Sequence, residues 1–119
     1  MIIALEGRWQ PLRAELAGES APGEALERME VELVAGRYIV RFGGEISDEG
    51  TYAHAADAAP MRLTLTGTGG PNAGRTIPCI FQLVGDRLRI CYGLGGARPE
   101  TFAAPAGTQH YLVSYRRKR

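Results

Sequence analysis

Hydrophobic and polar residues alternate along most of this chain with a period of two. The first clear run is Met29, Val31 and Leu33, which are separated by Glu30 and Glu32. Side chains of a strand point alternately to its two faces, so each such run predicts a strand with one apolar and one polar face. A sheet of these strands buries one face. Similar runs occupy residues 37–42, 61–66, 81–83, 87–90 and 111–116.

Short connections rich in glycine separate these runs. Ala35 and Gly36 join two of them, and Gly85 and Asp86 form a two-residue hairpin turn. The glycines and prolines leave few places for a helix. Only residues 24–29, which follow Ser20 and Pro22, favour one, and it has a turn or two. Longer connections cover residues 43–50, 67–75 and 93–107.

Sequential hairpins with one apolar face form either a sandwich or a closed barrel. Further strands over residues 7–17 and 51–55 bring the count to eight. Closure removes both exposed sheet edges, and eight strands enclose an interior that side chains fill or that holds one small ligand. We therefore expect an all-β fold, an eight-stranded up-and-down antiparallel barrel. It forms a single domain over residues 1–119, with at most one short helix after the first strand.

Composition narrows the choice of partners. The chain has 119 residues, and its 14 basic residues nearly balance 13 acidic ones, so no overall field attracts nucleic acid or an anionic membrane. We interpret the basic end, residues 116–119, as a solvated terminus. No segment has the roughly 20 apolar residues that span a bilayer. Residues 1–6 lack the charged and apolar regions of a signal peptide, so we expect a cytoplasmic location.

Candidate catalytic groups are scattered rather than clustered. His54 and His110 lie in separate strands without carboxylates or cysteines at metal-ligand spacing. Asp48 and Glu49 are neighbours that we place in a solvated turn. No serine has a Gly-x-Ser-x-Gly context, and the glycine-rich residues 67–70 lack the lysine of a phosphate loop. We therefore expect no enzyme activity, no metal and no cofactor.

The two cysteines sit in the strands that flank the turn at residues 85–86. Counting outward from the turn pairs Cys79 with Tyr92 and Cys91 with Ile80. Cys79 then points into the barrel and Cys91 points outward, so the two sulfurs cannot form a disulfide. We expect free thiols, as in the cytoplasm, with Cys91 accessible to solvent.

Several short motifs occur in a fixed order along the chain. They are Gly-Arg-Trp at 7–9, Gly-Thr-Tyr at 50–52, Gly-Pro-Asn-Ala-Gly-Arg at 70–75, the stretch 85–91, Arg-Pro-Glu-Thr-Phe at 98–102, and Arg117. Their order and spacing, over residues 5–117, resemble the uncharacterised lipocalin-like domain family that is expanded in planctomycete bacteria. The resemblance implies a small lipocalin-like β-barrel and no established activity.

Trp9 and Arg117 are the candidates for a structural clasp. Arg117 has the same parity as Val113 and Tyr115, and the first and last strands of a closed barrel are neighbours. Its guanidinium would stack on the indole of Trp9 and donate to backbone carbonyls of the first strand. The family pattern favours this clasp over two unrelated surface residues.

The barrel interior is the remaining place for function. In one hypothesis, a small apolar molecule binds at one end of the barrel and residues 18–26 form its lid. In the other, the barrel is filled and serves as a protein-interaction or homodimerisation module, so the protein is a monomer or a homodimer. Tyrosine hydroxyls would give a pocket its few polar points. The candidate ligand-binding residues are Tyr38, Phe42, Tyr52, Phe81, Tyr92 and Tyr115.

Overall fold

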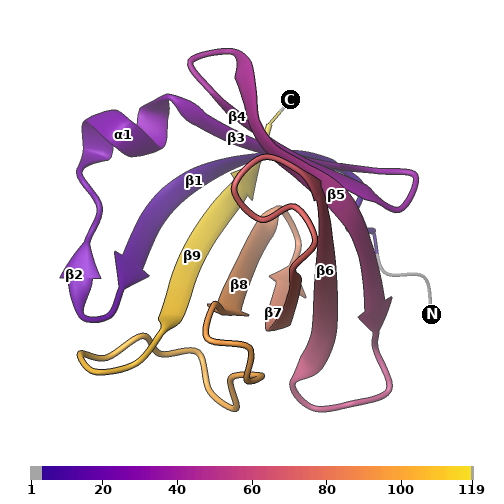
Figure 1. Ribbon diagram of the computed structural model, residues 1–119, viewed down its shortest axis with the longest axis vertical. Coiled ribbons are helices and arrows are strands. Elements are labelled where there is room, and N and C mark those ends of the chain that lie inside the picture. Colours follow the sequence, from indigo (N-terminus) through magenta and orange to yellow (C-terminus); the bar gives the residue numbers. More distant parts are fainter. Residues whose placement is uncertain (1–3, 119) are drawn as a thin grey trace.

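The computed structural model describes residues 4–118 and shows an antiparallel sheet that closes on itself (Figure 1). Strand β1 pairs with β3 on one side and with β9 on the other, so β1 and β3 to β9 form a closed eight-stranded barrel. The expected fold is therefore confirmed. The strands are β1 (Gly7–Leu16), β2 (Glu19–Ser20), β3 (Met29–Val34), β4 (Arg37–Phe42), β5 (Glu45–Ala55), β6 (Met61–Gly69), β7 (Thr76–Val84), β8 (Arg87–Gly93) and β9 (His110–Arg117).

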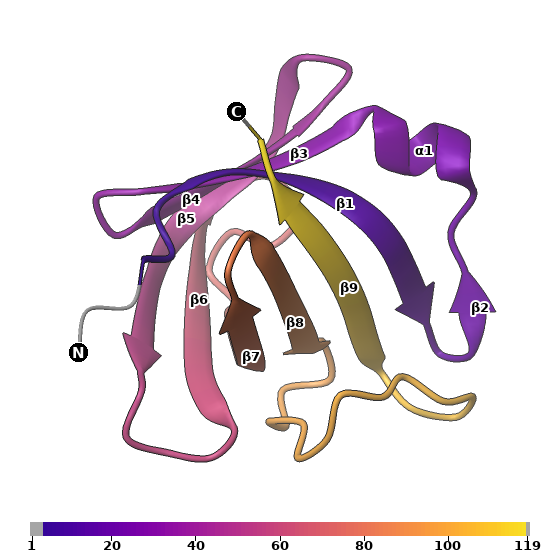
Figure 2. The same cartoon turned by 180° about the vertical axis from the view of Figure 1, so that it is seen from behind.

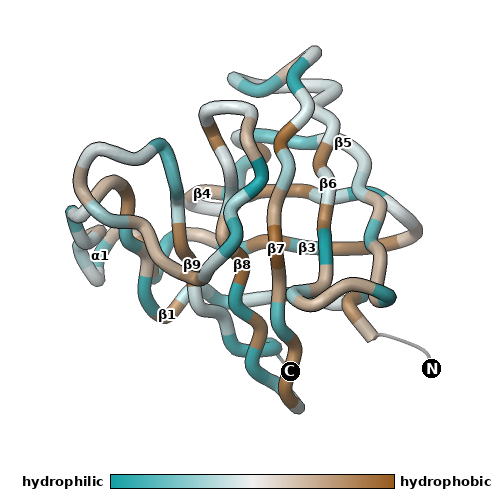
Figure 3. The backbone as a smooth tube through the Cα atoms, turned by 90° about the horizontal axis from the view of Figure 1, so that it is seen from below, coloured by the Kyte–Doolittle hydropathy of each residue, from teal (hydrophilic) through white to brown (hydrophobic). Residues whose placement is uncertain are grey.

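The alternating pattern places the apolar side chains inside this barrel. In Figure 3 hydrophobic and hydrophilic positions follow one another along the strands. The hairpin of β7 and β8 has the predicted register, with Leu83 opposite Leu88, Cys79 opposite Tyr92, and Ile80 opposite Cys91. A two-residue turn fixes the pairing of every residue that follows it, which explains why the sequence predicts this register.

The segment between β1 and β3 contains the expected short helix and a two-residue strand that the sequence does not predict. Helix α1 (Gly23–Glu27) is the one helix among residues 4–118, and its five residues are fewer than the six expected at 24–29. The two-residue strand β2 extends the sheet beside the end of β1. Helix α1 lies beside β1, outside the barrel (Figure 1). No helix that the structure describes is long and apolar enough to cross a membrane.

One end of the barrel is closed by the clasp of Trp9 and Arg117. Trp9 is fully buried, and its indole nitrogen donates to the Leu5 carbonyl at 3.0 Å. Strands β1 and β9 run side by side (Figure 2), with Trp9 opposite Arg117. The guanidinium lies 4.3 Å from the centre of the indole ring and donates to the carbonyls of Glu6 at 2.6 Å and Ala4 at 2.8 Å. The stacking and carbonyl contacts expected for the clasp are present, and its contribution to stability stays a prediction.

A long loop between β8 and β9 covers part of the outer barrel face; we call residues 94–109 the strap. Arg98 of the strap donates to the carbonyls of Leu63 at 3.1 Å and Cys79 at 2.6 Å. It also donates to the Thr64 hydroxyl at 3.0 Å. Pro78, opposite Thr64, has no N–H for the β6–β7 ladder, and Arg98 supplies donors beside this gap.

The strap corrects the expected accessibility of Cys91. Cys91 points outward, as predicted, but it is 0% exposed because the strap lies over it. Its sulfur donates to the strap carbonyl of Ala103 at 3.5 Å, and burial raises the thiol pKa. Ile80, on the same outer face, is buried as well. Both cysteines are free thiols on opposite faces, as expected.

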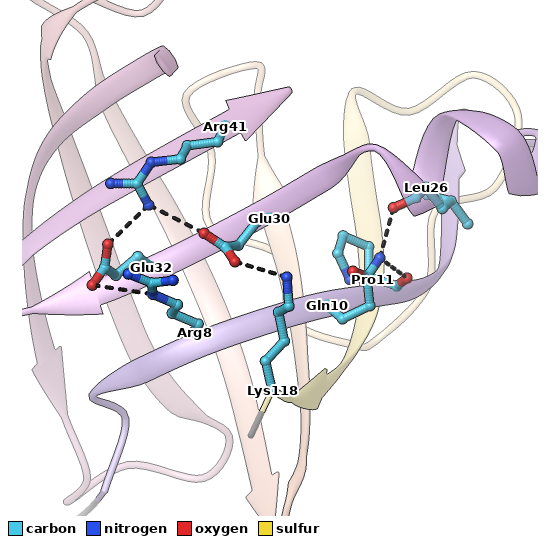
Figure 4. A network of polar contacts seen from close by, with 8 residues as sticks. All are labelled: Arg8, Gln10, Pro11, Leu26, Glu30, Glu32, Arg41 and Lys118. Atoms are coloured by element: carbon cyan, nitrogen blue, oxygen red, sulfur yellow. Dashed lines mark hydrogen bonds and ion pairs between the residues drawn. The ribbon is translucent and has the colours of Figure 1, made fainter. Parts of the chain in front are cut away.

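Charged side chains cover the outer face of β1, β3 and β4 (Figure 4). Arg41 lies between Glu30, at 3.1 Å, and Glu32, at 2.9 Å. Lys118 contacts Glu30 at 2.9 Å, so this residue of the basic end is tied to β3 rather than merely solvated. The hydrogen bond from Lys118 holds the pKa of Glu30 below its ordinary value. Arg119 lies outside the described residues, and so do residues 1–3, the first half of the segment that was assessed as a signal peptide.

Candidate functional site

A cavity of about 260 Å³ lies inside the barrel at the end opposite the clasp. Tyr111, at the start of β9, lines it and pairs with Leu16 at the end of β1, whereas Trp9 is near the start of β1. The barrel is thus packed at one end and hollow at the other. Most of the wall is aliphatic: Met29, Val31, Leu33, Val40, Leu63, Leu65, Ile77, Ile90 and Leu94. Seven further residues are polar or aromatic: Tyr38, Tyr92, Tyr111, Tyr115, Asp48, Asn72 and Arg75.

Two tyrosine hydroxyls meet in the wall of the cavity. The hydroxyls of Tyr92 and Tyr115 are 2.5 Å apart, and the ring of Tyr111 lies 5.4 Å from that of Tyr92. Burial raises the pKa of all three phenols, so all three are neutral at physiological pH. In the Tyr92–Tyr115 pair one hydroxyl donates and the other accepts. The hydroxyl that accepts has no hydrogen-bond acceptor of its own among residues 4–118, so its hydrogen is available to a bound molecule.

Tyr38 enters the wall because Gly50 leaves room for its ring. The two residues are opposite each other on β4 and β5. A Cβ atom at Gly50 would lie 2.5 Å from Cε2 of Tyr38 and 2.1 Å from the carbonyl oxygen of Thr66. Any larger side chain would therefore push the ring or the neighbouring strand away. The glycine of the Gly-Thr-Tyr motif is explained by this close approach.

Asp48 faces the interior in regular alternation with Gly50 and Tyr52. It lies opposite Val40, another cavity residue, while Ile46 lies opposite Arg41, so Ser47 is the extra residue between the two pairs. The extra residue places Ile46 on the outer face, although strict alternation from Asp48 would place it inside. The interior position of Asp48 corrects the expectation of a solvated turn. The strand β5 begins at Glu45, six residues before the predicted start.

The loop between β6 and β7 forms the polar edge of the cavity. Asn72 donates to Oδ2 of Asp48 at 2.8 Å, and Tyr38 donates to the same oxygen at 3.5 Å. Arg75 donates to Oδ1 of Asn72 at 3.0 Å and to the carbonyl of Leu94 at 2.6 Å. These hydrogen bonds link the loop to β5 and to the strap, so polar contacts hold the edge of the cavity in place.

The structure brings together three of the six candidate ligand-binding residues, Tyr38, Tyr92 and Tyr115, around the cavity. Phe81 is fully buried nearer the clasp, in the core rather than in the cavity wall. Tyr52 also packs against the core and is 6.5 Å from the ring of His54.

The structure corrects two expectations, the role of Phe42 as a ligand-binding residue and the role of residues 18–26 as a lid. Phe42 has the inward parity, but it is the last residue of β4 and is 43% exposed, beyond the end of the barrel interior. No residue of the segment 18–26 lines the cavity. Instead Leu26 packs into the core, and its carbonyl accepts a hydrogen bond from Gln10 at 2.7 Å (Figure 4).

Sequence reasoning missed Asp48, Asn72 and Arg75 as parts of the site. A signal for Asp48 was present, since it has the same parity as Tyr52, which was expected to face inward. Asn72 and Arg75 belong to the Gly-Pro-Asn-Ala-Gly-Arg motif. Its loop shape depends on contacts with β5 and the strap that lie far away in the sequence.

Comparisons with family models, with curated proteins and with solved structures found no match.

Proposed function

We propose that this protein is a non-enzymatic binding module that holds a small, largely apolar molecule in the cavity of its barrel. The observation that carries the proposal is the cavity itself: about 260 Å³ of space with a mostly aliphatic wall and a few polar points at one edge. Ligand sites of small molecules have this composition, because apolar surface supplies affinity and isolated polar groups fix orientation.

The size of the cavity suits a compact molecule. An apolar cavity of about 150 Å³ is enough to bind benzene. A volume of about 260 Å³ therefore accommodates a single ring with a short chain, or a flexible chain of moderate length. The clasp closes the opposite end, so the ligand enters past the polar edge formed by Asp48, Asn72 and Arg75.

The sequence also allows a filled barrel that acts as an interaction or homodimerisation module. This alternative is less well supported because the barrel is hollow at one end. The resemblance to the bacterial lipocalin-like family concerns the barrel fold and adds no activity. A cytoplasmic location remains part of the proposal, and the free thiols Cys79 and Cys91 are compatible with it.

Isothermal titration calorimetry with decan-1-ol, well below its solubility limit, tests the proposal. Three proteins are compared: wild type, Val40→Phe and Val84→Phe. Val40 lines the cavity, and a phenyl ring there occupies space that the ligand needs. Val84 is 66% exposed beside the β7–β8 turn, so the same substitution there adds a ring in solvent and serves as the matched control.

The proposal predicts binding to wild type and to Val84→Phe, with affinity reduced about tenfold or more in Val40→Phe, since about 1.4 kcal/mol of lost burial is a tenfold change. Absence of binding to wild type, or equal binding to all three proteins, would contradict it. A clean homodimer by native mass spectrometry together with no binding would favour the interaction module.

A further inference from the structure

The polar edge of the cavity contains a buried carboxylate oxygen with no partner. Oδ2 of Asp48 accepts hydrogen bonds from Asn72 and Tyr38, whereas Oδ1 is inaccessible to water and accepts none from the residues that the structure describes. Buried polar atoms in native proteins are almost always paired, because an unpaired one loses its hydration without compensation. An orphaned carboxylate oxygen is especially costly, since the group carries charge.

No cation in residues 4–118 forms an ion pair with Asp48. Two charged residues line the cavity, Asp48 and Arg75. Arg75 is exposed, and its hydrogen bonds go to Asn72 and to the Leu94 carbonyl. The neighbouring carboxylate, Glu49, differs in this respect, because Arg37 contacts it at 3.4 Å. The cavity thus presents a carboxylate whose counter-charge is not supplied by the residues that the structure describes.

Regular pairing of β4 with β5, from Arg37–Thr51 to Val40–Asp48, places this carboxylate inside the cavity, and the bulge at Ser47 lies directly before it. β-Bulges are common next to functional positions. The close approach of Gly70 adds to the arrangement. A Cβ atom at Gly70 would lie 2.9 Å from Oδ1 of Asp48, so the glycine leaves room for the carboxylate in this position.

We propose that the molecule bound in the cavity is a primary or secondary amine with an apolar body, whose ammonium group forms an ion pair with the Asp48 carboxylate. This inference rests on the proposed function and names its ligand class. The ammonium supplies the missing positive charge. A hydrogen bond between two ionised groups is about twice as strong as a neutral one. The apolar body lies along the aliphatic wall, toward the Tyr92–Tyr115 pair.

An anionic ligand would have to face Asp48 directly. A fatty acid, for example, would place its carboxylate beside that of Asp48, and like charges at such a distance repel. Arg75 is the group that would favour an anion. Its position at the solvent-exposed edge makes it the weaker determinant, because water screens its charge.

Calorimetry with three probes of equal chain length tests the inference: decylamine, decan-1-ol and decanoate, each below its critical micelle concentration. The protein variants are Asp48→Asn and, as a matched control, Glu49→Gln. Asparagine keeps the shape of Asp48 and an acceptor oxygen for Asn72, and it removes the charge. Glu49→Gln removes a neighbouring charge that is already paired with Arg37.

We expect wild type and Glu49→Gln to bind decylamine about tenfold more tightly than decan-1-ol, and decanoate most weakly. Asp48→Asn should lose this preference by weakening decylamine selectively while decan-1-ol binding persists. Equal affinities of the three probes for wild type, or an unchanged preference in Asp48→Asn, would overturn the amine and leave the cavity proposal standing. Tighter binding of decanoate would assign recognition to Arg75 instead. No binding of any probe would contradict the proposed function itself.

Discussion

Removing the guanidinium of the clasp gives the clearest test of how the barrel is held closed. In Arg117→Ala the protein loses a stacking contact 4.3 Å from the indole centre and two hydrogen bonds to the carbonyls of Glu6 and Ala4. It also loses an ion pair with Asp86 at 3.4 Å, which adds little because water screens the half-exposed carboxylate. The stacking contributes about 1 kcal/mol at a half-buried site. Each hydrogen bond contributes about 0.5–1 kcal/mol, because the freed carbonyls regain water. We therefore expect Arg117→Ala to lower the free energy of unfolding by about 2–3 kcal/mol.

Urea denaturation followed by tryptophan fluorescence measures this loss. Trp9 is the single tryptophan of the chain, so its emission reports on the clasp itself. With an m-value of about 1.5 kcal/mol per M, the midpoint should fall by about 1.5 M. Arg117→Lys keeps the charge but not the planar fork, and should recover part of the loss.

Arg116→Ala is the matched control, because Arg116 is the exposed neighbour of Arg117 on the outer face and should change stability by no more than about 0.5 kcal/mol. Trp9→Ala, followed by circular dichroism, should cost about 3–5 kcal/mol, as for other buried aromatic residues. A midpoint of Arg117→Ala that coincides with that of Arg116→Ala would refute the clasp as a stabilising element.

Three further predictions concern the strands and the strap. Gly50→Ala should destabilise the fold by about 1–3 kcal/mol, since its Cβ would overlap Tyr38 and the sheet. Gly23→Ala is the control, because Gly23 has open space around it, and equal denaturation midpoints of the two variants would contradict the close approach at Gly50. Arg98→Ala should loosen the strap and speed native-state labelling of Cys91 by a thiol reagent, whereas an unchanged labelling rate would show that Arg98 does not hold the strap. Burial raises the pKa of Tyr38 from 10.0 to about 12, so its neutral form stabilises the fold fully below pH 10 and this contribution is lost as the pH rises toward 12. A spectrophotometric titration should accordingly show less tyrosinate at pH 10 in the native protein than in the urea-unfolded one, and equal amounts would contradict the burial of the phenols.

The parts of the fold that the sequence predicts are those set by local rules. The register of β7 and β8 follows from a two-residue turn, and the partnership of Trp9 with Arg117 follows from parity and closure. The parts that it does not predict depend on contacts between distant segments. The burial of Cys91 depends on the strap, which directly follows β8 but is held over the outer face by contacts of Arg98 with β6 and β7.

The candidate site shows the same division. Tyr38, Tyr92 and Tyr115 have inward parity and line the cavity. Phe42 has inward parity too, but alternation does not tell where a barrel interior ends. Asp48 has inward parity as well, but the glycines at 43, 44 and 50 indicate a connection where β5 in fact begins, so the sequence does not place Asp48 in a strand.

The most direct test of the central claim, that this barrel holds a small apolar molecule at its open end, is a crystal structure of the protein grown with decan-1-ol. We predict continuous density for the alkyl chain between Val31, Ile77 and Tyr115, with the hydroxyl at the polar edge near Asp48. Side chains that fill this volume, or alcohol bound only on the outer surface, would contradict it.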